Sequence, residues 1–206
     1  MSHPNLHRKG PTVSVALQSL IDDHQRSYEA GAAVFRAGAP ARHVYHLTEG
    51  RVRLVRYGRA GEEAVIHVAR PGEFFAEASL HGDRYHCTAV AVVPSTLAAI
   101  PSAGLAALLA EDPGVMQAWV AILSSQLRRA RSRVERLCLR SAAERIEHLL
   151  LCEGSGPACI YRPGGSLKEL AVDLGLTHEA LYRTLANMVR DGRLVRDGQQ
   201  LSLPTA

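Results

Sequence analysis

The chain has 206 residues, of which 47% are hydrophobic and 21% charged, as in globular proteins with one or two domains. Its 24 basic and 20 acidic residues give a net charge of +4, which is too small to indicate a partner by itself. No run reaches the roughly 18 apolar residues of a membrane span, and the first residues lack the apolar core of a signal peptide. We therefore expect a cytoplasmic protein with no membrane partner.

Residues 1 to about 28 are polar and predict a mobile arm with one short helix near Val13–Asp22. The arm carries His3, His7 and His24, whose imidazoles are able to ligate a metal. Solvated histidines are the alternative interpretation of all three.

From Tyr28 to Pro101 the sequence changes to short β-branched and apolar runs separated by turns. The glycines that punctuate these runs are Gly31, Gly38, Gly50, Gly58, Gly61, Gly72 and Gly82. Residues 44–47 and 52–57 flank Glu49-Gly50 in the way expected of a hairpin. Many short strands joined by turns predict a small antiparallel barrel or roll.

A long amphipathic helix is predicted after Asp112-Pro113, where proline suits a helix start. Apolar residues spaced alternately four and three apart are Met116, Val120, Leu123, Leu127, Ala130, Val134 and Leu137. A heptad of this length predicts a coiled-coil seam, and no other segment is long enough to pair with it, so we expect a homodimer. The alternative is that the stripe packs on the roll, which would have to cover about 33 Å of helix.

Residues 141–152 predict a further amphipathic helix, and residues 166–192 predict two helices separated by a tight turn. The first apolar stripe comprises Leu167, Leu170, Ala171 and Leu174, and the second comprises Ala180, Leu181, Leu185, Met188 and Val189. Gly175 ends the first helix, because it tolerates a left-handed backbone, and Thr177 is suited to cap the second. The pattern predicts a helix-turn-helix.

In such a unit the second helix enters the DNA major groove with its first turns toward the bases. The outward positions of that helix are His178, Glu179, Tyr182 and Arg183. An arginine can donate two hydrogen bonds to guanine, and a glutamate can accept one from cytosine. A helical hairpin with a solvated polar face is the alternative at this point.

Residues 194–196 and 199–203 flank Asp197-Gly198 and predict a β-hairpin, hence a wing that follows the helix-turn-helix. Ser166, Lys168 and the wing's Arg196 are expected to contact the DNA backbone instead of the bases.

The order of roll, long helix and winged helix-turn-helix resembles the Crp/Fnr family of bacterial transcription regulators. The resemblance covers residues ~28–203 and includes Gly31, Gly38, Gly50, the Gly72–Glu77 segment and the helix-turn-helix. It implies an α+β protein with an arm and a cyclic-nucleotide-binding-like jelly roll (1–110), a dimerisation helix (111–140) and a DNA-binding domain (141–206).

The same resemblance implies a homodimer that binds a palindromic promoter site and works with RNA polymerase. Glu179 and Arg183 match the family's base-reading pair, Thr177 precedes them, and His178 falls where subfamilies vary. The implied half-site has a TGA-like core, with His178 and Tyr182 setting the flanking preference. A signal is expected to pass from the roll to a hinge near Leu137–Ser141.

The effector site departs from the family pattern. Cys87 and Thr88 stand where members that bind cyclic AMP carry an arginine and a serine, so the phosphate would lack its counter-charge and cyclic AMP is not expected. No cysteine precedes Cys87, which argues against an iron–sulfur cluster. The effector-pocket candidates are Phe75, Glu77, His86, Cys87 and Thr88. The surrounding segments look most like the branch of haem-dependent nitric oxide regulators of denitrification, so haem is one candidate cofactor.

His81, His86 and Cys87 are further weak metal candidates, although adjacent residues of a strand point to opposite faces. The remaining cysteines, Cys138, Cys152 and Cys159, include no C-x-x-C pair, and reduced, packed thiols are expected, with Cys138 a candidate redox handle near the hinge.

An enzyme is not expected, because the sequence lacks a phosphate-cradling glycine loop, an H-E-x-x-H motif and a G-x-S-x-G motif. The alternative function is a roll that binds a ligand and regulates a protein partner, as in kinase regulatory subunits.

Overall fold

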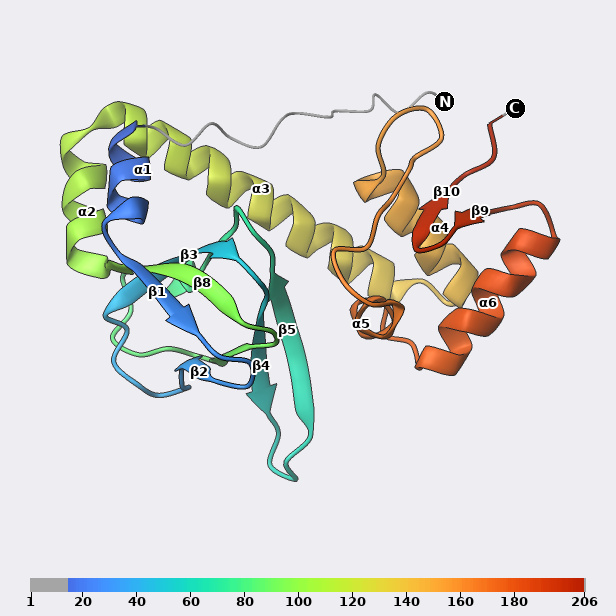
Figure 1. The fold of residues 1–206 in the computed structure, drawn as a ribbon, viewed down its shortest axis with the longest axis horizontal. Helices are drawn as coiled ribbons and strands as arrows, with labels where there is room; N and C mark the ends of the chain where they lie inside the picture. Colours follow the sequence, from blue (N-terminus) through green and yellow to red (C-terminus); the bar gives the residue numbers. More distant parts are fainter. Residues whose placement is uncertain (1–14, 206) are drawn as a thin grey trace. The chain divides into compact units, whose positions relative to one another are not determined.

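The computed structural model describes residues 15–205 of the chain (Figure 1). These residues form two compact units, which divide inside a long helix between Ala121 and Ile122. The first unit is built from two four-stranded sheets, and the second is helical with a two-stranded sheet. The α+β fold class is therefore as the sequence predicted.

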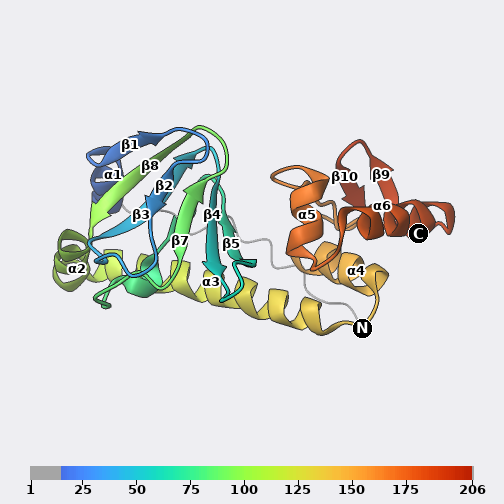
Figure 2. The same ribbon diagram turned by 90° about the horizontal axis from the view of Figure 1, so that it is seen from below.

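The first unit is an antiparallel β-roll. Its elements are α1 (Val15–Asp22), β1 (Gln25–Tyr28), β2 (Ala33–Phe35), β3 (His43–Glu49), β4 (Val52–Tyr57), β5 (Glu63–Ala69), β6 (Phe74–Phe75), the 3-10 helix η1 (Glu77–Ser79), β7 (Thr88–Ala91), β8 (Ser95–Pro101) and α2 (Ser102–Glu111). One sheet has the order β1-β8-β3-β6 and the other the order β2-β7-β4-β5. Figure 2 shows the roll with α1 and α2 at one end of the strands.

The predicted hairpin at Glu49-Gly50 is wrong, because the two flanking strands belong to different sheets. β3 pairs with β6 and β8, whereas β4 pairs with β5 and β7. Gly50 has a positive φ of 93°, and a Cβ on it would overlap Ser95 and lie 2.6 Å from the Pro94 carbonyl oxygen. Glycine is required here because two connections between the sheets pass against each other.

Residues 15–28, predicted as part of a mobile arm, belong to the roll instead. Leu17 and Ile21 of α1 are buried, and β1 pairs along β8. His24 approaches the Leu20 carbonyl oxygen through Nδ1 at 2.9 Å. His3 and His7 lie outside the described residues.

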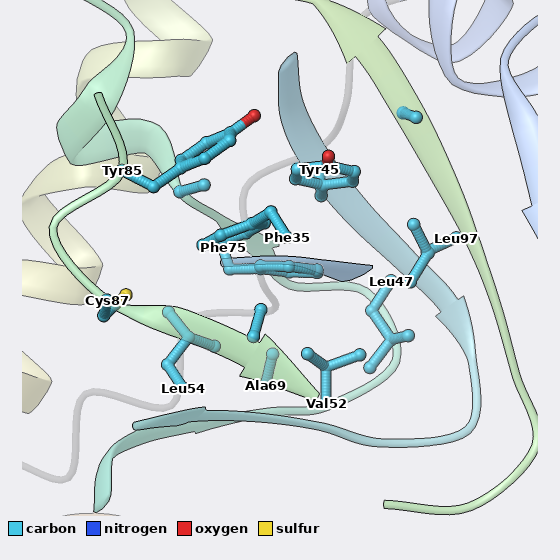
Figure 3. Packing of buried hydrophobic residues seen from close by; sticks show 13 residues of the cluster. Phe35, Tyr45, Leu47, Val52, Leu54, Ala69, Phe75, Tyr85, Cys87 and Leu97 are labelled. Atoms are coloured by element: carbon cyan, nitrogen blue, oxygen red, sulfur yellow. The ribbon is translucent and has the colours of Figure 1, made fainter. Parts of the chain in front are cut away.

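Aromatic rings occupy the interior of the roll (Figure 3). The centroids of Phe35 and Tyr85 are 3.9 Å apart, and those of Tyr45 and Phe75 are 5.2 Å apart. The Tyr85 hydroxyl donates to the His43 carbonyl at 2.8 Å, so its polar end has a partner inside the protein. These rings come from both sheets, Phe35 from β2 and Tyr45 and Phe75 from β3 and β6, and they pack in one cluster with aliphatic side chains.

The long helix α3 (Pro113–Cys138) carries two apolar stripes. Its start is capped by Asp112, whose carboxylate accepts hydrogen bonds from the Gly114 and Val115 amides. Val115 and Trp119 are buried in the first unit, where the Trp119 ring meets the Phe74 ring edge-on at 5.1 Å. The predicted dimer seam is a different stripe, and all of its members are exposed: Met116, Val120, Leu123, Leu127, Ala130, Val134 and Leu137.

The second unit contains α4 (Ala142–Glu153), α5 (Leu167–Asp173), α6 (His178–Arg190), β9 (Val195–Asp197) and β10 (Gln200–Ser202). Its core combines leucines from α4, α5 and α6 with Leu194, which precedes β9, and Leu201 of β10. Because the helices and the hairpin region share this one core, the helix-turn-helix and its wing are held together by burial of apolar surface.

Arg145 of α4 joins the end of α3 to the helix-turn-helix. Its guanidinium donates to the carbonyl oxygens of Leu137 and Leu139 at 3.3 and 3.0 Å. It also donates to the carbonyl oxygens of Leu174 and Gly175 at 3.0 and 3.2 Å. Carbonyls at helix ends lack partners within the helix, and a charged donor satisfies several of them at once.

Among the described helices, none is by itself long and apolar enough to cross a membrane. Only α2 and α3 together meet that criterion, as a pair bent by 118°.

Candidate nucleic-acid interface

The first helix of the pair, α5, starts with a capping box. The Ser166 hydroxyl accepts from the Glu169 amide at 3.3 Å, and the Glu169 carboxylate accepts from the Ser166 amide at 2.8 Å. Two amides of the first turn are thereby satisfied by local side chains. Lys168 lies exposed in the same turn, so its ammonium group is available at the helix start.

The turn between the helices depends on Gly175, as predicted. Its φ is +62°, and a Cβ on it would lie 2.9 Å from Leu137 Cδ2 and 3.2 Å from an Arg145 guanidinium nitrogen. A side chain at this position would therefore suffer both from backbone strain and from overlap with its neighbours.

The second helix, α6, starts at its predicted cap, where Thr177 accepts from the Ala180 amide at 3.1 Å. Leu181, Leu185 and Met188 face the core and are buried. The opposite face carries the four residues predicted to point outward, and all are exposed: His178, Glu179, Tyr182 and Arg183. The helix thus places polar and charged groups in its first two turns on one accessible face.

Glu179 and Arg183 have no ion pair or hydrogen bond to another side chain within the described part of the chain. Both side chains project from the face opposite the buried leucines, one helical turn apart. An arginine and a glutamate left without protein partners are chemically available to donate to, and accept from, the edges of base pairs.

The predicted wing is present as the hairpin β9–β10. Asp197 pairs with Gln200, and Gly198 in the turn has a φ of +57°. Arg196 of β9 donates from Nε to the Gly198 carbonyl oxygen at 2.9 Å, and its Cζ lies 5.5 Å from the centre of the Tyr182 ring. The wing therefore contacts α6 through a side chain on the polar surface, in addition to the shared core.

The effector-pocket candidates fall in three different environments. Phe75 and Cys87 are buried in the core of the roll. The Thr88 hydroxyl accepts from the Ala37 amide at 3.1 Å, so it already has a backbone partner. His86 is exposed, and its carbonyl oxygen accepts from Arg56 Nε at 3.0 Å. The last candidate, Glu77, starts η1 and is partly buried.

Burial raises the pKa of the Glu77 carboxyl and of the Cys87 thiol above their ordinary values. Both groups are therefore biased toward their neutral forms, whereas a cyclic phosphate needs a positive charge at its binding site. Cys87 in the core has the environment of a small packed side chain rather than that of an anion ligand.

No group of three histidine, cysteine, aspartate or glutamate side chains capable of holding a metal occurs among residues 15–205. His86 is exposed while Cys87 is buried, so the two side chains do not share one site, although both lie in a bend before β7 and not in the strand that the sequence predicted. Cys138 and Cys152 are exposed, and Cys159 packs against the second core. Of the three N-terminal histidines that were metal candidates, His3 and His7 lie outside this range.

Sequence reasoning missed three features of the molecule. Trp119 packs on the roll through a stripe separate from the seam, Arg145 binds four carbonyl groups, and Tyr182 contacts Arg196. The only available sequence signal was for Trp119, a large apolar residue between two seam positions. The contacts of Arg145 and Tyr182 depend on segments that are distant in sequence.

The comparisons with known proteins agree with this architecture. A profile of the cyclic nucleotide-binding domain matches residues 25–112, which span all strands of the roll. The cyclic AMP receptor protein of Thermus thermophilus is 31% identical over 173 residues, which are 82% of this chain and 78% of that protein. The chain belongs to the Crp/Fnr family.

Other Crp/Fnr members resemble the chain over similar lengths. The global nitrogen regulator of Synechococcus elongatus is 30% identical, covering 78% of this chain and 71% of that protein. The c-di-GMP-responsive regulator CLP of Xanthomonas campestris has a TM-score of 0.62 at 26% identity, covering 89% of this chain and 94% of the other. FixK2 of Bradyrhizobium japonicum has a TM-score of 0.70 at 23% identity, covering 88% and 92%, and supports the fold alone.

This Crp/Fnr protein is accordingly a DNA-binding transcription regulator, as the sequence predicted. Its relatives are named as transcription regulators and not as enzymes. The names of these relatives mention nitrogen, cyclic AMP and c-di-GMP, which are different signals. The denitrification branch and its haem therefore stay predictions for this chain.

Proposed function

We propose that this regulator acts as a homodimer that binds an inverted repeat in promoter DNA with one α6 helix in each half-site. The observation that carries the proposal concerns Glu179 and Arg183 in the first turns of α6. Both side chains are exposed and form no ion pair or hydrogen bond with another side chain among residues 15–205. Dimerisation is supported by the apolar seam of α3, in which Leu127 is 51% and Val134 64% exposed in the single chain. A two-fold dimer presents its recognition helices about 34 Å apart, which matches one turn of DNA.

Within each half-site, Arg183 donates to guanine O6 and N7, and Glu179 accepts from a cytosine amino group. His178 and Tyr182 set the preference for the flanking base. Lys168 and Arg196 neutralise phosphates, and the Thr177 hydroxyl, which accepts at its helix cap, donates its proton to a phosphate oxygen. Ser166 lies against the DNA backbone at the start of α5, where its own hydroxyl donates to the Glu169 carboxylate at 3.2 Å.

The roll is proposed to work without cyclic AMP. Cys87 lies in the core, Thr88 accepts from a backbone amide, and aromatic rings fill the interior (Figure 3). Any effector that controls the protein must bind one arrangement of its two units better than another. We further propose that the dimer acts in the cytoplasm, carries no enzymatic activity and recruits RNA polymerase through its outer surfaces, as is usual in the family.

A titration of wild type, Arg183→Ala and Lys168→Ala against two duplexes tests the proposal. One duplex carries TGA triplets as an inverted repeat one helical turn apart, and the other has the same bases in scrambled order. Arg183→Ala should weaken the matched complex by about 1–3 kcal/mol and leave scrambled binding nearly unchanged. Lys168→Ala should weaken both complexes alike and lower the salt slope by about one for each subunit bound.

If Arg183→Ala lowered the affinity for both duplexes equally, this face of α6 would not read bases. If the wild type bound no duplex in a salt-dependent way, the alternative of a roll that regulates a protein partner would gain support.

A further inference from the structure

We propose that Tyr182 is a positioning residue whose ring holds the wing's Arg196 against α6, so that recognition helix and wing engage DNA as one unit. The inference rests on the proposed function, because it concerns how the same surface holds phosphate. It concerns a role different from base reading, since the ring acts here through a second side chain.

The geometry consists of three side chains in contact on the exposed face of the second unit. The Tyr182 ring lies 4.4 Å from the His178 ring on the preceding turn of α6, with an angle of 54° between the planes. Arg196 Cζ lies over the same ring, 5.5 Å from its centre. The Tyr182 ring therefore contacts both His178 of its own helix and Arg196 of the wing.

Arg196 is held at two points. Its Nε donates to the Gly198 carbonyl oxygen inside the wing turn, and its guanidinium carbon lies within the range of a cation–π contact with Tyr182. Within residues 15–205 the two Nη groups have no hydrogen bond. The side chain is thus fixed in place while its two terminal nitrogens stay available to an acceptor.

The chemistry of the free ends identifies the ligand as a phosphate of the DNA backbone. Two parallel N–H groups of a guanidinium match the two oxygens of a phosphate, which accounts for the frequency of arginine at such contacts. A free arginine side chain loses much rotamer freedom on binding, so a ring that restricts it beforehand makes the contact stronger. Within the hairpin, the Arg196 side chain is held by one hydrogen bond, to the Gly198 carbonyl oxygen, and the Tyr182 ring supplies the second contact.

The experiment measures binding of the full-length protein to the scrambled duplex, and to the inverted TGA repeat, by fluorescence anisotropy at several salt concentrations. The variants are Tyr182→Phe, Tyr182→Ala, Tyr182→Leu, Arg196→Ala and the double variant Tyr182→Ala/Arg196→Ala. Arg190→Ala is the matched control, because it removes an equal charge from the far end of α6, where the arginine pairs with Asp191. Tyr182 is 40% exposed, so its replacement leaves the core of the unit intact.

Arg196→Ala should lower the salt slope by about one for each subunit. Tyr182→Ala and Tyr182→Leu should weaken binding to the scrambled duplex about two- to fivefold, the range expected for loss of an exposed cation–π contact. Tyr182→Phe keeps the ring and should bind the scrambled duplex like wild type. In the Arg196→Ala background, removing the ring should cause no further loss on this duplex.

The inference is overturned if Tyr182→Ala and Tyr182→Leu leave scrambled binding unchanged, or if the loss is as large without Arg196 as with it. The proposed function fails differently, through a wild type that does not prefer the inverted repeat or does not bind DNA at all. Tyr182→Leu decides the case if Tyr182→Ala does not fold, since leucine preserves an apolar side chain without a π face.

Discussion

The β-roll and the winged helix-turn-helix are both built around apolar cores. They differ in the side chains at the positions where the sequence predicts binding of an effector or of DNA. In the roll, the positions expected from the family resemblance to hold a cyclic phosphate carry a buried thiol and a hydroxyl that accepts from a backbone amide. In the second unit, Glu179 and Arg183 are exposed and have no side-chain partner among residues 15–205. The comparison teaches that the expected effector positions are engaged inside the protein, whereas the predicted base-reading positions are accessible.

The largest expected effect comes from disrupting the exposed apolar seam of α3, through which we propose that two subunits pair and bind DNA together. Leu127→Asp places a charge among apolar side chains, so light scattering should show monomers. Binding to the inverted repeat should fall about 100-fold or more, because the two half-site contacts are no longer linked. Ala121→Asp, on the same helix outside the seam, is the control and should stay dimeric. A dimeric Leu127→Asp variant would remove the coiled-coil proposal.

A second prediction tests whether the roll can bind cyclic AMP once an arginine stands at position 87. Cys87→Arg restores the family's guanidinium but buries a charge without a partner, which should destabilise the roll by about 3 kcal/mol or more in urea unfolding. Cys87→Ala should cost about 1 kcal/mol by comparison. Calorimetry should detect no heat of cyclic AMP binding to either variant. A rise in melting temperature with cyclic AMP for Cys87→Arg would mean that only the counter-charge is missing and that the aromatic interior can open.

A third prediction concerns the four hydrogen bonds that Arg145 donates within the second unit. Arg145→Met retains an apolar stem of similar length but leaves four carbonyl groups, at the end of α3 and just after α3 and α5, without this donor. Unfolding free energy should fall by about 2 kcal/mol, and DNA binding should weaken as the turn at Gly175 loosens. Arg140→Met, at an exposed site five residues earlier, should change neither quantity. Equal effects of the two substitutions would refute the role of Arg145.

The smallest effects are opposite responses to pH in the two units. Burial raises the pKa of Glu77, so its contribution to stability is complete below about pH 4.5 and is lost as the pH rises through the folded pKa. Hydrogen bonds from Ser141 lower the pKa of Glu144, whose contribution is present above about pH 4.5 and is lost as the pH falls through the folded pKa. Urea unfolding is measured between pH 3 and 7 in steps of ~0.5 pH unit. The difference in unfolding free energy between wild type and Glu77→Gln should change with pH in the opposite direction to the difference between wild type and Glu144→Gln. Slopes of the same sign would contradict these assignments.

The sequence predicted those features that depend on local chemistry. Gly175 and Thr177 mark the turn of the helix-turn-helix because a left-handed residue and a cap are needed at fixed places. The outward face of α6 followed from helical periodicity in the same way. The family's order of elements made the fold class predictable once these motifs were in place.

Features that depend on pairing between distant segments could not be predicted. Alternating patterns on both sides of Gly50 suggest strands, but they do not say that one strand pairs with β8 and the other with β5. Polarity similarly suggested an arm for residues 15–28, although Leu17 and Ile21 are buried and β1 pairs with β8. The partners of Arg145 and Tyr182 became known only when the fold brought them together.

The exposed apolar stripe of α3 also has a consequence for how the regulator responds to its own abundance. If the dimer is the form that binds DNA, then below the dissociation constant of the dimer its concentration rises with the square of the subunit concentration. Doubling the rate of synthesis would then raise promoter occupancy about fourfold at low saturation. Changes in gene dosage or protein turnover would thus change promoter occupancy more than proportionally, with no small molecule bound in the roll.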